Sequence, residues 1–170
     1  MMEDKESVLW SKGYQVKFQG ACVYIWCPIY GEEATLPEMC ELEDFEDWLD
    51  DKEKQEVRAR ALERAVLDGA SYKMAYEDEV LEMCYEKLRE EVNERIEIWE
   101  NVKTVHRKIN GYDVYLYTFV GENDGYVTYY VEMEIPEELY EQMDADAIID
   151  LFNEMLEEMD YPDLGLPEFI

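Results

Sequence analysis

The alternation of hydrophobic and polar residues predicts two groups of β-strands. In the first group, residues 14–19 alternate with the period of two that is typical of a strand. Gly20 then breaks the run, and residues 23–27 form an apolar strand that Pro28 is expected to end. We interpret these two strands as a hairpin.

The second group contains the clearest turn signal in the chain. The dipeptide Asn-Gly at 110–111 separates residues 103–109 from residues 112–120, and it supplies the positive φ angles of a type I′ turn. A Gly-Glu-Asn-Asp-Gly loop at 121–125 then returns the chain into a third strand over 126–135. The sequence therefore predicts a three-stranded antiparallel meander.

Elsewhere, hydrophobic residues recur every three or four positions, as on the buried face of a helix. Helices are predicted over residues 38–51, 52–67, 73–99, 137–142 and 144–159, the last capped by Asp144. In the longest helix, one face clusters the side chains expected in the core: Leu81, Tyr85, Leu88, Val92, Ile96 and Trp99. Residues 1–13 and 160–170 are expected to be irregular.

These elements predict a single α+β domain over residues 1–170, in which an antiparallel hairpin and a three-stranded meander pack with about four amphipathic helices. The length of 170 residues is enough for one domain with a proper core. An aromatic content of 14% argues against intrinsic disorder.

The charge of the chain departs from that of an ordinary domain. Its 44 acidic residues outnumber 15 Lys and Arg, which gives a formal net charge of −29. Residues 109–170 contain no Lys, Arg or His, yet they interleave 17 carboxylates with core-forming residues. Folding such a surface costs self-repulsion, which indicates that the charge has a use. The negative electrostatic field of such a protein opposes direct binding to nucleic acid or an anionic membrane and attracts basic proteins.

The sequence lacks the motifs of catalysis. His106 is the single histidine, and no serine lies in a Gly-x-Ser-x-Gly setting. The spacing of Cys22, Cys27, Cys40 and Cys84 matches neither a zinc site nor a thioredoxin motif. We therefore expect no enzymatic activity, no cofactor and no metal. A metal-dependent hydrolase built on carboxylates alone is the third-ranked alternative for the function.

Carboxylates gather on the outer faces of three predicted helices. The residues predicted to contact a partner are Glu79, Glu82, Glu86, Glu90, Glu94 and Glu97 in the long helix, Asp44, Asp47 and Asp51 in the first helix, and Asp146, Asp150, Glu154, Glu157 and Glu158 in the final helix. One such helix carries about one carboxylate per 5 Å, whereas a DNA strand carries one phosphate per about 3.4 Å. Two or three helices side by side would reach the density of a nucleic acid.

The basic residues concentrate in the predicted helix over residues 52–67. This helix contains Lys52, Lys54, Arg58, Arg60 and Arg64. We expect these side chains to tie the acidic helices together inside the protein rather than to form a basic binding patch.

In charge, compactness and lack of catalytic motifs, the chain resembles the acidic DNA-mimicking inhibitors of phages and plasmids, the anti-CRISPR and anti-restriction proteins. The resemblance covers composition and helix faces and includes no family motif, so it transfers no functional residue. It implies an inhibitor that occupies the basic DNA- or RNA-binding groove of a bacterial or archaeal defence complex, such as a CRISPR–Cas effector or a restriction enzyme. The expected location is the cytoplasm, that of the host cell if the protein is viral.

The main alternative is an immunity protein or antitoxin that neutralises a basic toxin such as a nuclease. Such a protein would bury a focused acidic patch with aromatic anchors, which Trp10, Tyr72, Tyr76 and the Tyr-rich strands could supply. The same strands could instead form a homodimer interface. No apolar run approaches the length of a membrane span, so no membrane partner is expected.

Overall fold

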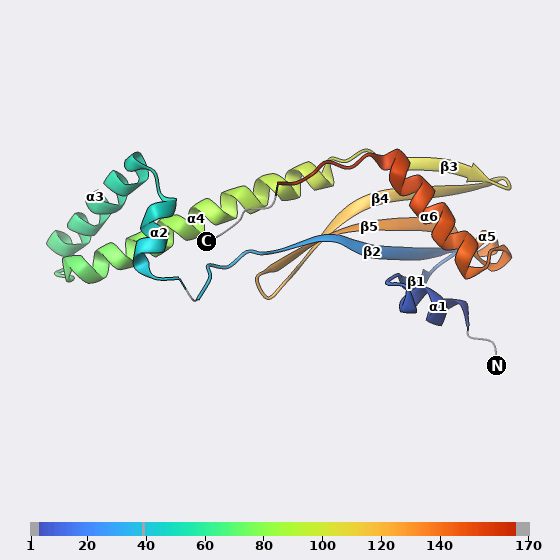
Figure 1. The fold of residues 1–170 in the computed structure, drawn as a ribbon, viewed down its shortest axis with the longest axis horizontal. Helices are drawn as coiled ribbons and strands as arrows, with labels where there is room; N and C mark the ends of the chain where they lie inside the picture. Colours follow the sequence, from blue (N-terminus) through green and yellow to red (C-terminus); the bar gives the residue numbers. More distant parts are fainter. Residues whose placement is uncertain (1–3, 39, 166–170) are drawn as a thin grey trace. The chain divides into compact units, whose positions relative to one another are not determined.

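The structure is a computed structural model that describes residues 4–38 and 40–165 (Figure 1). Its helices are α1 (Lys5–Ser11), α2 (Leu42–Trp48), α3 (Asp51–Leu67), α4 (Tyr72–Glu100), α5 (Glu137–Gln142) and α6 (Ala145–Met159). Its strands are β1 (Gln15–Gln19), β2 (Cys22–Glu33), β3 (Val105–Ile109), β4 (Tyr112–Asn123) and β5 (Tyr126–Pro136). The predicted α+β class is confirmed. At the N-terminus, Asp4 caps α1, where an irregular segment was expected.

The strands form one five-stranded antiparallel sheet in the order β1-β2-β5-β4-β3. The predicted hairpin and meander therefore belong to the same sheet, joined through β2 and β5. Asn110 and Gly111 have φ angles of 50° and 85°, as a type I′ turn requires. Asp124 and Gly125 form a second tight turn, with φ angles of 50° and 78°, in place of the predicted five-residue loop.

Strand β2 continues through Pro28 to Glu33, so the prediction that Pro28 ends the strand is wrong. The neighbouring strand β1 pairs only as far as Gln15, which lies opposite Trp26. Beyond Trp26, β2 is hydrogen-bonded to β5 on one side only. Proline is tolerated in such an edge segment because its missing N–H group is not needed for pairing.

The chain divides into two compact units. Within the described residues, the sheet unit comprises 4–32 and 95–164, and the helical unit comprises 33–38, 40–94 and 165. Helix α4 contributes its last turns to the sheet unit and the rest of its length to the helical unit.

In the sheet unit, helices cover one face of the sheet, and α6 crosses it against β3 and β4 (Figure 1). Alternate residues of β5 are buried beneath this cover: Val127, Tyr129, Val131, Met133 and Ile135. From α6, Ile148, Phe152 and Met155 are fully buried in the same core. The side chains that recur every two residues on β5 and every three or four residues on α6 therefore pack together in one hydrophobic layer, as the sequence pattern predicts.

A buried ion pair ties the end of β2 to α4 and β5 inside the sheet unit. The side chain of Arg95 pairs with Glu32, its Nε lying 2.9 Å from Oε2, and the hydroxyl of Tyr129 donates to the same carboxylate. Arg95 and Glu32 are only 6% and 7% exposed, and Tyr129 is fully buried. The mutual pairing offsets the desolvation of both charges.

The helical unit is built on a core of six buried residues: Phe45, Leu49, Val57, Val80, Met83 and Cys84. The predicted helix over 38–51 is shorter than expected, because Asp50 begins a new helix by capping the backbone N–H of Glu53 at 2.7 Å. Asp51 therefore lies in the first turn of α3, where the helix dipole stabilises its negative charge.

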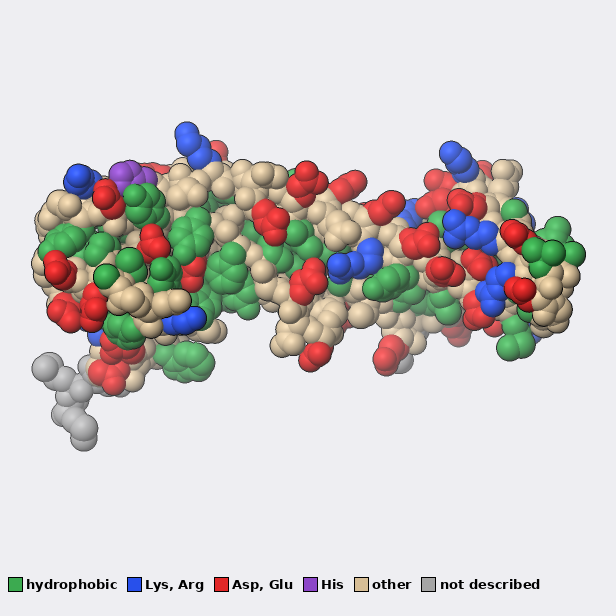
Figure 2. Space-filling view, turned by 180° about the vertical axis from the view of Figure 1, so that it is seen from behind, with side chains coloured by type: hydrophobic (Ala, Val, Ile, Leu, Met, Phe, Trp, Pro, Cys, Tyr) green, Lys and Arg blue, Asp and Glu red, His purple; other side chains and the backbone are tan. Residues whose placement is uncertain are grey.

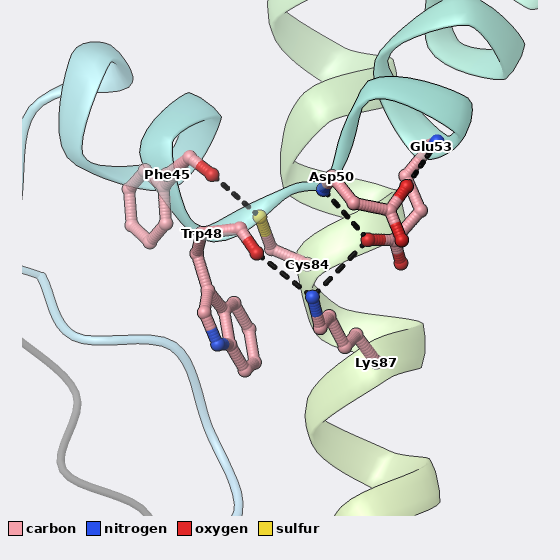
Figure 3. A network of polar contacts seen from close by, with 6 residues as sticks. All are labelled: Phe45, Trp48, Asp50, Glu53, Cys84 and Lys87. Carbon is pink, nitrogen blue, oxygen red and sulfur yellow. Dashed lines mark hydrogen bonds and ion pairs between the residues drawn. The ribbon is translucent and has the colours of Figure 1, made fainter.

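Lys87 of α4 holds this helix junction together (Figure 3). Its ammonium donates to the backbone carbonyl of Trp48 at 2.8 Å and to the carboxylate of Glu53 at 3.1 Å. Glu53 in turn accepts a hydrogen bond from the backbone N–H of Asp50 at 2.9 Å. One base thereby fixes the end of α2 and the start of α3 against α4.

The buried face of α4 differs from the prediction in its first half. Leu88, Val92 and Trp99 are buried as expected, but Leu81 and Tyr85 are 39% and 47% exposed. The residues buried in their place are Ala75, Glu79, Val80, Met83 and Cys84. A single face drawn along the whole helix fails because α4 packs into two separate cores.

We predict that Arg95→Met destabilises the sheet unit by about 3–5 kcal/mol, because it leaves the buried Glu32 carboxylate unpaired. Urea unfolding followed by circular dichroism measures the change. Adding Glu32→Gln to this variant should recover part of the loss, since the neutral amide can still accept from Tyr129. Arg107→Met, which breaks two partly exposed ion pairs with Glu154 and Glu158, is the matched control and should cost about 1 kcal/mol or less. Equal losses of unfolding free energy from the two arginine substitutions would contradict the conclusion that Arg95 compensates a buried charge.

Candidate functional site

The predicted acidic row of α4 is thinner than its sequence indicates. Glu82, Glu90, Glu94 and Glu97 are exposed, and their carboxylates form no hydrogen bond or ion pair with another described residue. Glu86 lies 4.0 Å from the guanidinium of Arg60. The predicted acids of α4 that are both exposed and unpaired among the described residues are therefore spaced more widely than the predicted row.

The prediction is wrong for Glu79. Its side chain is only 6% exposed, and it lies 3.3 Å from Nη1 of Arg64 in α3. Packing of α3 covers this position, which a helical projection of α4 alone places on the solvent side. Glu79 is thus a structural acid inside the helical unit.

The acidic face of α6 is half neutralised. Asp146, Asp150 and Glu157 are exposed and unpaired among the described residues. Arg107 of β3 reaches across to the other two acids, lying 2.9 Å from Glu154 and pairing with Glu158. The hydrogen bond from this guanidinium lowers the pKa of Glu158 below its ordinary value.

The three acids predicted near α2 divide in the same way. Asp44 is half-buried and accepts a hydrogen bond from the backbone N–H of Glu41 at 3.0 Å, so it serves the N-terminus of α2. Asp47 and Asp51 are exposed and unpaired within the described part of the chain. Nine of the 14 predicted contact acids therefore remain available: Asp47, Asp51, Glu82, Glu90, Glu94, Glu97, Asp146, Asp150 and Glu157.

The role predicted for the bases of α3 holds for two of the five. Arg60 bridges Glu56 and Glu86, and Arg64 bridges Asp78 and Glu79, so both tie α3 to α4. Lys52, Lys54 and Arg58 form no ion pair with a described acid. The two α3 bases that pair, Arg60 and Arg64, therefore lie between α3 and α4.

The structure also presents a second surface, which we call the open sheet face. It consists of the side chains that point away from the helices: Tyr24, Trp26, Tyr115, Tyr117, Phe119, Tyr130, Glu132 and Glu134. All eight are half-buried, and no described helix of the sheet unit covers them. Figure 2 views the molecule from the side away from α6 and shows green aromatic and apolar side chains interleaved with red carboxylates.

The two glutamates lie on the central strand β5, between tyrosines of the neighbouring strands. Glu132 accepts a hydrogen bond from the hydroxyl of Tyr117, with an O–O distance of 2.5 Å. Glu134 accepts a hydrogen bond from the hydroxyl of Tyr24, and this bond raises the pKa of Tyr24. Burial, followed by the bond to Glu132, raises the pKa of Tyr117 as well. The phenols therefore stay protonated and act as donors that fix both carboxylates.

A shallow pocket of about 460 Å³ opens on the same face. It is lined by Lys17, Trp26, Phe119, Gly121, Glu122, Asn123, Thr128, Tyr130 and Glu132. The rings of Phe119 and Tyr130 stack 4.7 Å apart at an angle of 8°. A side chain at Gly121 would meet the ring of Tyr130 at 3.0 Å, so glycine allows this ring to lie flat against β4.

Sequence reasoning identified the Tyr-rich strands but not the face they share. The signal is the period of two: Tyr24 and Trp26 alternate with the buried Val23 and Ile25 of β2. Hydropathy alone does not separate the faces, because aromatic residues occur on both. The register of β4 against β5 is what places Tyr117 opposite Glu132.

Two side chains that could support chemistry, His106 and Cys84, each form a local contact within their own unit. His106 is exposed, lies 2.8 Å from Asp113 and stacks on Tyr115. Among the described residues, no group of three His, Cys, Asp or Glu side chains could hold a metal ion. Cys84 is buried, and its thiol donates to the backbone carbonyl of Phe45 at 3.3 Å.

Comparison with known proteins gives no relative of this chain. It matches no protein-family model, and neither a characterised protein nor a solved structure is detectably similar to it. Among the described residues, no helix combines the length and the apolar character needed to cross a membrane. The function is therefore argued from the two surfaces themselves.

We predict that Cys27 and Cys84 react slowly with iodoacetamide in the folded protein. Burial raises the pKa of each thiol from 9.0 to about 11, so the reactive thiolate at pH 8 is about 100-fold scarcer than for an ordinary thiol. Mass spectrometry of the labelled peptides should show a rate that rises about tenfold per pH unit up to about pH 11. The control is the protein in urea, where all four cysteines should react alike. Fast labelling of the folded protein at pH 8 would contradict the burial of these thiols.

Proposed function

We propose that this protein is a non-enzymatic inhibitor that binds a basic nucleic-acid-binding protein and occupies the surface where DNA or RNA would otherwise lie. The observation that carries the proposal is a set of exposed carboxylates on helices that pair with no other described residue. In the helical unit these are Glu82, Glu90 and Glu94 of α4 together with Asp47 and Asp51. The protein has 44 acidic residues and only 15 Lys and Arg, so most of its acids have no base that could neutralise them.

A helix fixes the spacing of such charges. Glu90 and Glu94 are one turn apart, about 6 Å along the axis, and Glu82 lies about 12 Å further back. Because the helix already fixes the backbone, binding has to order only the glutamate side chains. A cationic groove would release its bound anions when it meets them, as it does on binding DNA.

The target class we propose is a bacterial or archaeal defence complex such as a CRISPR–Cas effector or a restriction enzyme. These complexes hold DNA or RNA in basic grooves, and their inhibitors include acidic proteins that the present chain resembles in charge. A net charge of −29 opposes direct contact with nucleic acid and attracts such grooves. Action in the cytoplasm, of a host cell if the protein is viral, follows from the same proposal.

A second candidate is an immunity protein or antitoxin that neutralises a basic toxin. The open sheet face favours it, because Glu132 and Glu134 lie among aromatic side chains in one focused patch. Aromatic anchors around a few charges are typical of tight protein–protein interfaces. The two candidates differ in where the partner binds and in whether nucleic acid competes.

The test is a triple charge reversal, Glu82→Lys, Glu90→Lys and Glu94→Lys. The partner is captured from a bacterial lysate on the immobilised wild type, purified, and its affinity for each variant is measured with and without a DNA duplex. We expect the triple variant to bind at least tenfold more weakly, because a groove that holds phosphates repels lysines. DNA should displace the wild-type protein.

The matched control reverses three exposed acids outside the predicted set, Glu33→Lys, Glu63→Lys and Asp68→Lys. It has the same net charge as the test variant, so a loss caused by net charge alone would appear in both. Retention of most of the affinity by the control, together with loss by the test variant, supports the proposal. A partner that DNA does not displace, and that binds the test variant normally, would reject it.

A further inference from the structure

We infer that the open sheet face is a docking site for a cationic side chain of a partner protein, with arginine as the preferred residue. The inference deepens the proposed function by naming the chemistry of one contact, and it rests on that proposal only for the basic character of the partner. The residues of the open sheet face belong entirely to the sheet unit, whereas the triple charge reversal described above changes residues of the helical unit.

The first observation is the build of the face. Its aromatic side chains alternate with the buried residues of the same strands, so they stand on the side of the sheet that α1, α5 and α6 do not cover. A contiguous aromatic surface on a folded protein marks an interaction site more often than a scattered apolar residue does. Trp and Tyr are the residues that dominate the energetics of such sites.

The second observation is the distribution of charge. Glu132 and Glu134 lie on the central strand, while the bases Lys17 and Lys108 lie on the outer strands β1 and β3. Asp113 lies opposite Lys108, so the margin carries both signs of charge, whereas the centre of the face is negative. An approaching anion, such as a nucleic-acid phosphate, is repelled at the centre, whereas a cation is attracted there.

The third observation is the pocket beside Glu132. Its volume of about 460 Å³ exceeds that of one long side chain, and Trp26, Phe119 and Tyr130 contribute its aromatic lining. The Glu132 carboxylate accepts one bond from Tyr117 and keeps lone pairs free for a second donor. A guanidinium can stack on an indole and donate two parallel bonds to a carboxylate, which a lysine ammonium does less well.

Lys17 makes the pocket discriminating. It is exposed on β1 and contributes to the lining, so its charge opposes an incoming cation. Removing this charge should strengthen the binding of a cation and weaken the binding of an anion. The opposite pair of effects is expected for Glu132. The effects of changing Lys17 and Glu132 together therefore show whether the natural ligand is a cation or an anion.

The experiment titrates the full-length protein with a nine-residue peptide in which arginine alternates with serine. Its control is the same peptide with each arginine replaced by citrulline, which has nearly the same shape and no charge. Nitrogen-15 NMR should show shifts at the Trp26 indole and at Phe119, Tyr130 and Glu132 with the arginine peptide only. Because it uses the wild type, this arm does not depend on the folding of a variant.

Three single variants complete the test. Glu132→Gln keeps an acceptor for Tyr117 and should weaken peptide binding about tenfold, and Lys17→Ala should tighten it about twofold or more. Glu157→Gln removes one exposed charge from α6 and should change binding less than twofold. Equal effects of Glu132→Gln and Glu157→Gln would overturn the inference, because they would indicate attraction by net charge alone.

Other outcomes overturn the inference in recognisable ways. If a single-stranded oligonucleotide produces the shifts and the two pocket variants act with inverted signs, the face binds an anionic or base-stacking ligand. If the NMR signals of the open sheet face shift when only the protein concentration is raised, a second copy of the chain covers this face. Either result leaves the DNA competition at the helical acids intact, so failure here is distinct from failure of the proposed function.

Discussion

Like-charge repulsion is the constraint on which the rest of this structure depends. With 44 acids and 15 bases, the chain can neutralise only part of its charge, and the structure places several bases at junctions between elements. Arg95 pairs with Glu32 inside the sheet unit, Lys87 joins α2 and α3 to α4, and Arg107 joins β3 to α6. Packing is thereby stabilised where helices and strands meet, and the outward carboxylates keep their charge.

The two surfaces that result differ in chemistry. The helical acids are separate, solvated charges spread along a helix, which suits a long basic groove and gives a modest energy per contact. The open sheet face has few charges, but its aromatic side chains and hydrogen-bonded carboxylates are partly shielded from water, which strengthens each contact. A protein that needs both reach and specificity can combine them, with charge accelerating the encounter and the aromatic pocket slowing dissociation.

Sequence patterns predicted the elements well and their partners less well. Asn110-Gly111 and Asp144 specify a turn and a helix start through local backbone chemistry, so both were predictable. Glu79 was misplaced because its burial depends on α3, a neighbour that no projection of α4 contains. The pocket beside Glu132 could not be predicted from the sequence for the same reason, since it depends on the alignment of β2, β5 and β4.

We propose that exposed carboxylates on the helices, unpaired among the described residues, take the place of phosphates in a basic groove. The most direct measurement is the salt dependence of the affinity between this protein and its purified partner. We expect log K to fall linearly with the logarithm of the salt concentration, with a slope that becomes shallower when Glu82, Glu90 and Glu94 are neutralised together. A slope near zero, or one that the triple substitution leaves unchanged, would contradict it.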